Sequence, residues 1–110
     1  MKLAVTGSKS IERFDLTEYI GEDVDVIISG GEGGVDSSAE WYADWYGLSK
    51  YILRPDFRRY GAEAVTKKLE TMVDLADKVL VVWDGKSEGC SYLIRYAQKS
   101  NKDIRVINNI

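Results

Sequence analysis

Five short apolar runs alternate along this chain with longer stretches of helical period, and this alternation limits the possible folds more than any other feature. The runs are mostly bounded by glycine or aspartate, as strands are. They are KLAVTG, DVIISGG, YILRP, KVLVVWDG and DIRVINN, centred near Val5, Ile27, Ile52, Val81 and Val106. Strands that alternate with helices predict an α/β fold with a doubly wound, parallel, five-stranded sheet flanked by helices.

The expected order of the strands follows from this class of fold. In a doubly wound sheet we expect the order 3-2-1-4-5, which reverses between the first and fourth strands. The run KVLVVW lacks polar alternation, as a strand covered on both faces requires, so we expect it near the centre of the sheet. A chain of 110 residues is long enough for one domain, over residues 1–110, with a substantial core.

Three stretches between the runs carry apolar residues at helical spacing and predict helices that cover the sheet. The first should start at Asp36 or at a capping box of Ser37 with Glu40, and should stop at Gly47. A weaker pattern over residues 11–21 predicts a short helix. The apolar stripes, in chain order, are Val35, Ala39, Tyr42, Ala43 and Tyr46; Val65, Leu69, Met72, Val73 and Ala76; and Cys90, Leu93, Ile94 and Ala97.

Composition argues against several classes of function. The net charge of −3 and the pI near 5.0 leave no basic surplus of the kind that drives sequence-independent binding to nucleic acid. The absence of histidine excludes histidine-based catalysis, and a single cysteine argues against a zinc site. No apolar run approaches the length of a membrane span, and no signal peptide is evident. We therefore expect a cytoplasmic protein without a membrane partner.

Three loops that contain glycine each follow a predicted strand directly. They read TGSKS after the first strand, SGGEGGVD after the second and WDGKSEGCS after the fourth. In the expected strand order these loops meet at the carboxyl edge of the sheet, where the order reverses. Backbone N–H groups at helix starts bind anions, and glycine lets a phosphate approach. The loops together predict a site for a phosphate-bearing ligand, although a tight turn explains each single glycine equally well.

Several residues in these loops have two open interpretations. Asp36 either binds ribose hydroxyls or a metal-bound phosphate, or caps a helix. Asp84 and Glu88 either hold a cation together with a polyphosphate or are ordinary charged loop residues. Glu32 is expected to be solvated at the loop tip. Cys90 lies near a helix start, where the dipole lowers a thiol pKa, yet it has no base nearby and is expected to pack on the sheet.

The loop after the third strand is rich in arginine. Arg54, Arg58 and Arg59, with Tyr60, surround the sequence PDF and should overhang the crevice at the sheet edge. Guanidinium groups make bidentate contacts with phosphate, and the tyrosine ring can stack on a base. A solvated basic loop is the alternative interpretation.

Two tryptophans lie outside the core-facing stripe of the first long helix. Trp41 and Trp45 are one helical turn apart, and together with Leu48 they form a second apolar face. A small sheet leaves such a face uncovered, so we expect this helix to mediate a homo-oligomer.

The motifs VTGSKS, SGGEGGVDSSA, RPDFRRYGAEA and WDGKSEGC, in this order, resemble those of the SLOG superfamily, in particular its small YspA-like branch. The resemblance covers nearly the whole chain. It implies a Rossmann-like fold and a nucleotide-derived small molecule as partner. The superfamily includes the Lonely Guy phosphoribohydrolases, the DNA-processing protein DprA and many domains thought to sense or process nucleotide derivatives. Such a resemblance is better evidence for the fold than for the function, because the function depends on the residues of the site.

Two departures from the Lonely Guy pattern bear on activity. Those enzymes have an arginine four residues before a methionine that precedes the third loop, and a glutamate shortly after that loop. Here the two positions are Lys68 and Leu93. Because both catalytic positions are altered, we expect binding or sensing rather than catalysis. The alternatives are an N-glycosidic hydrolase acting on nucleotide monophosphates, as in phosphoribohydrolases, and binding of single-stranded DNA in the manner of DprA.

The residues and the resemblance together give one expected ligand-binding set. The resemblance adds Asp56 of the middle loop and matches Lys9 to a position where arginine is usual. We expect no metal site and no resident cofactor, while Mg²⁺ accompanying a phosphate ligand stays open. The set is Gly7, Ser8, Lys9, Gly30, Gly31, Gly34, Asp36, Arg54, Asp56, Asp84, Gly85, Ser87, Gly89 and Cys90.

Overall fold

The computed structural model describes residues 1–108 and contains one five-stranded sheet in which all neighbouring strands are parallel. The order of the strands is β3-β2-β1-β4-β5, which confirms the predicted doubly wound arrangement and its reversal between β1 and β4. Each predicted run forms a strand. The strands are β1 (Lys2–Gly7), β2 (Val26–Ser29), β3 (Ser49–Ile52), β4 (Lys78–Trp83) and β5 (Asp103–Asn108).

Three long helices connect the strands, at the places where the apolar stripes predicted them. A short helix and a single 3₁₀ turn lie between β3 and the second long helix. No helix within residues 1–108 is long and apolar enough to cross a membrane. The helices are α1 (Val35–Tyr46), α2 (Phe57–Tyr60), η1 (Gly61–Glu63), α3 (Ala64–Leu75) and α4 (Glu88–Lys99).

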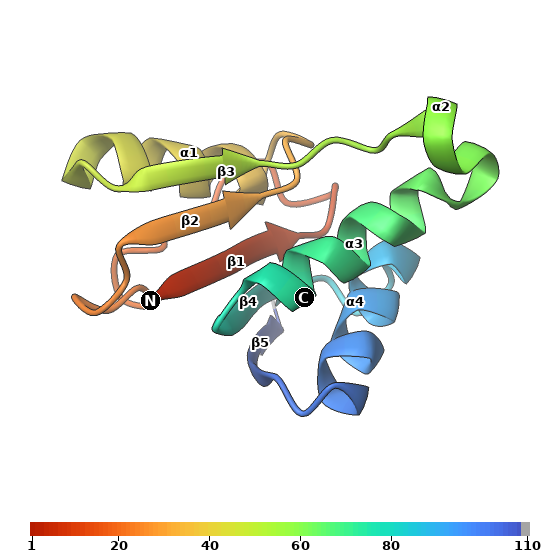
Figure 1. Ribbon diagram of the computed structural model, residues 1–110. Coiled ribbons are helices and arrows are strands. Elements are labelled where there is room, and N and C mark those ends of the chain that lie inside the picture. The colour runs from red at the N-terminus through yellow and green to blue at the C-terminus, as the bar shows by residue number, and fades with distance from the viewer. Residues whose placement is uncertain (109–110) are drawn as a thin grey trace.

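The sheet has a separate apolar core on each face, because successive side chains of a strand point to opposite sides. In β1, Leu3 and Val5 contribute to the core under α1, whereas Ala4 contributes to the core under α3 and α4. Figure 1 shows α3 and α4 side by side over one face of the sheet. The arrowheads of β1, β2 and β3 all point toward the side on which α2 lies, so α2 stands at the carboxyl edge.

The position of each strand explains its sequence. In β4, residues 79–82 are all buried between β1 and β5, so the prediction of a strand covered on both faces is correct. The central strand of the five is β1, one place from β4. All four residues of the edge strand β3 are exposed.

The predicted short helix over residues 11–21 is wrong. This segment runs through turns, and Asp15 Oδ1 accepts hydrogen bonds from both the N–H and the hydroxyl of Thr17 (3.0 and 2.7 Å). Such a local side-chain bond offers the backbone an alternative to the helical ladder. Ile11, Leu16 and Ile20 are nevertheless buried, so the segment covers the same face as α1 without forming a helix.

Neither predicted side-chain cap forms at the start of α1. The capping position is Gly34, with φ of 55°, and no side chain caps the helix. Glu40 accepts a hydrogen bond from the Ser29 hydroxyl (2.5 Å) and so does not close a capping box with Ser37. The predicted stop is correct: Gly47 adopts the left-handed conformation, and its N–H caps the helix end.

Candidate functional site

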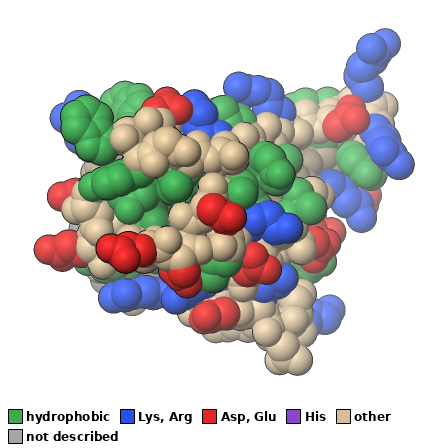
Figure 2. Space-filling model, turned by 60° about the vertical axis from the view of Figure 1, so that its left-hand side comes forward, with side chains coloured by type: hydrophobic (Ala, Val, Ile, Leu, Met, Phe, Trp, Pro, Cys, Tyr) green, Lys and Arg blue, Asp and Glu red, His purple; other side chains and the backbone are tan. Residues whose placement is uncertain are grey.

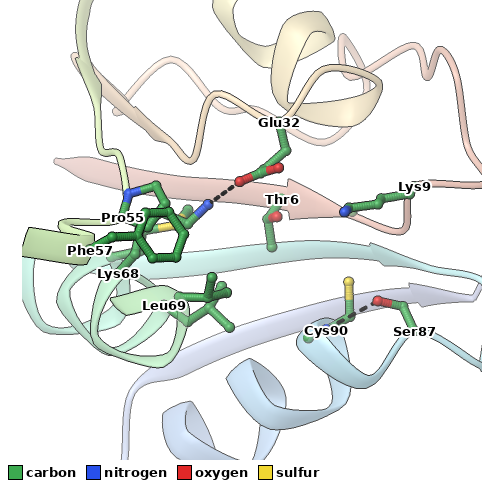
Figure 3. Close-up of a pocket in the computed structure, with 13 residues that line it drawn as sticks. Thr6, Lys9, Glu32, Pro55, Phe57, Lys68, Leu69, Ser87 and Cys90 are labelled. Carbon is green, nitrogen blue, oxygen red and sulfur yellow. Dashed lines mark hydrogen bonds and ion pairs between the residues drawn. The ribbon is translucent and has the colours of Figure 1, made fainter. Parts of the chain in front are cut away.

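A pocket of about 390 Å³ opens at the carboxyl edge of the sheet. The segments that follow β1, β2, β3 and β4 all contribute to its wall, as does α3, so it lies where the strand order reverses. Figure 3 shows its labelled side chains arranged around Thr6. The lining residues are Thr6, Gly7, Lys9, Glu32, Pro55, Phe57, Val65, Lys68, Leu69, Met72, Ser87, Gly89 and Cys90.

The pocket has two chemically different ends. Pro55, Phe57 and Leu69 form an apolar wall on one side of Thr6, and Lys9 and Ser87 lie on the other side (Figure 3). Phe57 is 60% exposed, so it is available for contact with a ligand. An apolar wall beside convergent polar groups is the usual composition of a small-molecule site.

The polar end is formed by the first turn of α4. The Ser87 hydroxyl caps this helix by accepting a hydrogen bond from the Cys90 N–H (3.4 Å). No heavy atom lies within 4 Å of the position that a Cβ on Gly89 would take, apart from its own helix backbone and chain neighbours. The positive end of the helix dipole, the exposed Lys9 and this open glycine together suit an anionic group.

An ion pair between the buried Lys68 and the half-exposed Glu32 lines the pocket. The ammonium of Lys68, whose side chain is only 3% exposed, donates to Glu32 Oε1 at 2.7 Å and to the Gly30 carbonyl at 3.3 Å. The hydrogen bond from Lys68 is the main reason that the pKa of Glu32 is lowered. Glu32 is exposed at the loop tip, as expected, with 45% of its side chain open to solvent, and its carboxylate also compensates the buried charge of Lys68.

Asp36 lies behind this pair, in the first turn of α1. Asp36 is 2% exposed, and its Oδ2 accepts a hydrogen bond from the Glu32 N–H (3.0 Å). Its Oδ1 is buried without a hydrogen-bond partner among residues 1–108. Burial raises the pKa of this carboxyl to about 6. Asp36 therefore orders the second glycine loop. The interpretation of Asp36 as the cap of α1 is wrong.

The first and third loops are tied together beside the pocket. The buried Ser8 hydroxyl accepts a hydrogen bond from the Asp84 N–H (2.9 Å). Asp84 in turn accepts from the Ser10 hydroxyl (2.7 Å) and from the N–H groups of Lys86 and Ser87 (2.8 and 3.0 Å). These hydrogen bonds lower the pKa of Asp84, and the bond from the Ser10 hydroxyl has the largest effect. Ser8 and Asp84 thus shape the loops, and neither lines the pocket.

The predicted glycines differ in what requires them. A Cβ on Gly7 would lie 2.4 Å from Val35 Cγ2, so Gly7 lets α1 pack against the end of β1. Gly34 has φ of 55°, and a Cβ there would lie 2.5 Å from the Ile11 carbonyl oxygen. At both positions close packing is the reason for glycine. Gly89 is the glycine of the expected set that lines the pocket and faces open space.

The loop after β3 reaches the pocket with different residues from those predicted. Pro55 and Phe57 line it, whereas Arg54 and Asp56 line a separate small hollow. Asp56 is the N-cap of α2, since its side chain accepts from the Arg59 N–H (3.1 Å). The aromatic side chain at the pocket is Phe57 rather than Tyr60.

The remaining candidates carry little reactivity. Cys90 is 4% exposed, and burial raises the pKa of its thiol, which disfavours a nucleophilic thiolate. Within residues 1–108 there is no group of three acidic or cysteine side chains that would hold a metal ion. Glu88, the other cation candidate, is exposed and lines a neighbouring hollow with Gly85.

The structure thus brings part of the expected set together. Gly7, Lys9, Ser87, Gly89 and Cys90 line one pocket. The apolar wall and Thr6 are not predicted from the sequence, in which Lys68 is a departure from a family pattern that can still neutralise phosphate. A signal for Lys68 existed, because it occupies a core position four residues before Met72. The predicted residues outside the lining are Ser8, Gly30, Gly31, Gly34, Asp36, Arg54, Asp56, Asp84 and Gly85.

Comparison with known proteins adds no relative. No protein-family model, no curated protein and no solved structure matches this chain. The fold is therefore assigned from its own sheet topology, and the chemistry of the pocket rests on its own residues.

Proposed function

We propose that this protein binds or senses a nucleotide-derived ligand that carries phosphate, in the pocket at the carboxyl edge of the sheet. The phosphate would lie at the first turn of α4 beside Lys9, and the apolar part of the ligand would lie against Phe57 and Leu69. The observation that carries the proposal is the presence of both kinds of surface in one pocket, at the reversal of the strand order.

The resemblance of the motifs to the SLOG superfamily supports the same ligand class independently. It matches Gly7 and Ser8 of the first loop, and Ser87 and Gly89 of the third, which are the loops that flank the polar end. Membership in that superfamily is part of the proposal.

Binding is favoured over hydrolysis by the composition of the pocket. Leu93, at the position where the Lonely Guy enzymes have a catalytic glutamate, is fully buried in the core under α4. Among the lining residues Glu32 is the one carboxylate, and it is engaged by Lys68. A general acid or base needs a titratable group in reach of the substrate. The net charge of −3 likewise disfavours the alternative of DNA binding.

Thermal unfolding in the presence of nucleotides tests the proposal. AMP, ADP or ADP-ribose should raise the melting temperature, and a ligand at a hundred times its dissociation constant adds about 2.7 kcal/mol of stability. Gly89→Val should abolish the rise by blocking phosphate approach, and it fits the open space at that position. The control is Ser91→Val on the same turn, because Ser91 does not line this pocket. No rise with any of these nucleotides, with or without Mg²⁺, would refute the proposal.

We also propose that the protein self-associates through α1. Trp41 and Trp45 are 60% and 84% exposed, and Tyr46 beside them is 55% exposed. These side chains and the segment 13–17 line a hollow of about 370 Å³, and Figure 2 shows hydrophobic side chains gathered on one face of the molecule. Exposed aromatic patches of this kind mark interaction surfaces, and a twofold contact would cover the tryptophans of both copies.

A further inference from the structure

Lys68 is an unusual residue for the wall of a pocket, because its charge is withdrawn from water. It projects from α3 between the buried residues Ala64 and Met72. Within residues 1–108 its hydrogen-bond partners are the Glu32 carboxylate and the Gly30 carbonyl, and Glu32 is its one carboxylate within ion-pair distance. Burying an ammonium is costly unless an anion compensates it. Asp36 also interacts electrostatically with Lys68, but the direct ion pair is made by Glu32, so an anionic group at the place of Glu32 stabilises the buried ammonium.

Glu32 is held in that place only weakly by its surroundings. Its side chain is 45% exposed, and it is the single side chain in the run GGEGG. The flanking Gly31 and Gly33 have φ of 66° and 82°, and a Cβ on Gly33 would meet no atom within 4 Å. Rotation of the Glu32 side chain into solvent would therefore uncover the ammonium without disturbing the core. The Glu32 N–H can keep its hydrogen bond to Asp36 during this rotation.

The ion pair and the first turn of α4 lie apart in the pocket. Figure 3 shows Lys68 on the side of the apolar wall, Glu32 above Thr6, and Lys9 and Ser87 on the opposite side of Thr6. One phosphate at the α4 end would leave Lys68 paired with Glu32. A ligand with a second anionic group, set apart from the first, would reach both places.

We propose that Lys68 is a second anion-binding subsite, and that Glu32 occupies it in the free protein as a stand-in for an anionic group of the ligand. This inference rests on the proposed function. It narrows the ligand class to a nucleotide with two separated anionic groups. Binding then exchanges the Lys68–Glu32 ion pair for an ion pair between Lys68 and the ligand, and Glu32 is released to water.

Adenosine 3′,5′-bisphosphate and AMP are the probes that test the inference by calorimetry. Glu32→Gln removes the competing charge and keeps the shape, so affinity for the bisphosphate should rise about tenfold, with a smaller change for AMP. Lys68→Met should lower bisphosphate affinity at least tenfold, and methionine suits the buried position. Glu18→Gln is the control, since it changes net charge equally from an exposed site on the segment over the other face.

Two results with Glu32→Gln would overturn the inference. Weaker binding would make Glu32 a direct contact of the ligand, and unchanged binding of the bisphosphate would mean that the carboxylate does not compete. Equal gains for both probes would remove the claim of two separated groups.

A separate measurement distinguishes failure of the subsite from failure of the proposed function. The side-chain NH₃⁺ signal of Lys68 is followed by NMR while inorganic phosphate is added to Glu32→Gln. If neither nucleotide binds any variant but phosphate shifts this signal, the subsite stands and the nucleotide proposal falls. If neither nucleotide binds and phosphate leaves the signal unchanged, both are wrong.

Discussion

The protonation state of Asp36 should change as the pH approaches neutrality. Burial raises its pKa from 3.8 to about 6. A group whose pKa is higher in the folded protein takes up a proton on folding, so its contribution to stability is full below pH 3.8 and is lost as the pH rises through 6. The folded protein therefore favours the protonated, neutral carboxyl of Asp36.

Asp36→Asn isolates this contribution. Relative to wild type, the variant should become more stable as the pH rises from 4 to 7.5, by about 2 kcal/mol, because one pKa unit corresponds to about 1.4 kcal/mol and part of the effect already lies below pH 4. Urea unfolding at several pH values measures the difference. A constant difference between Asp36→Asn and wild type across this range would contradict the account of Asp36.

The residues of the site were only partly predictable from sequence. Ser87 and Gly89 lie at the start of α4, and the glycine-containing segment between a strand and a helix that holds them is visible in the sequence. The partnership of Glu32 and Lys68 joins residues 36 positions apart, and no local pattern reports it. Gly7 and Gly34 were predicted for the ligand, but their neighbours in space are Val35 and Ile11.

At the scale of elements, strands and long helices were predictable because each has its own period. The segment between β1 and β2 was not, because the hydrogen bonds of Asp15 with Thr17 replace helical ones while the apolar residues keep a helix-like spacing. The pocket wall depends on α3, whose stripe was correctly assigned to a core. Val65 and Leu69, in the N-terminal half of α3, line the pocket.

The first turn of α4 is the element that should bind phosphate, and Ser87 separates its two functions. Aspartate and asparagine are both good N-caps. The free energies of unfolding of Ser87→Asp and Ser87→Asn should therefore each lie within about 0.5 kcal/mol of the wild-type value. Only the aspartate adds a negative charge where the phosphate should lie. It should lower AMP affinity at least tenfold, whereas the asparagine should not. Equal AMP affinities for the two variants, measured by calorimetry, would exclude this turn as the phosphate site.

At the scale of the whole molecule, the exposed tryptophans of α1 predict a dimer. Light scattering at micromolar concentration should give twice the monomer mass of 12.4 kDa. Trp45→Lys should return the mass to that of the monomer, because a charge in the contact would be desolvated. Tyr51→Lys on the exposed edge strand is the control and should leave the dimer intact. A monomeric wild type would disprove self-association through α1.

The central claim concerns one place on the whole molecule, the pocket between Lys9, Phe57 and the start of α4. An NMR titration of the backbone amides with AMP tests it most directly, because it reports where the ligand binds as well as whether it binds. The account predicts the largest shifts at Gly89, Cys90 and Phe57, with small shifts over α1. Absence of shifts at these three amides up to millimolar AMP, or shifts confined to α1, would contradict it.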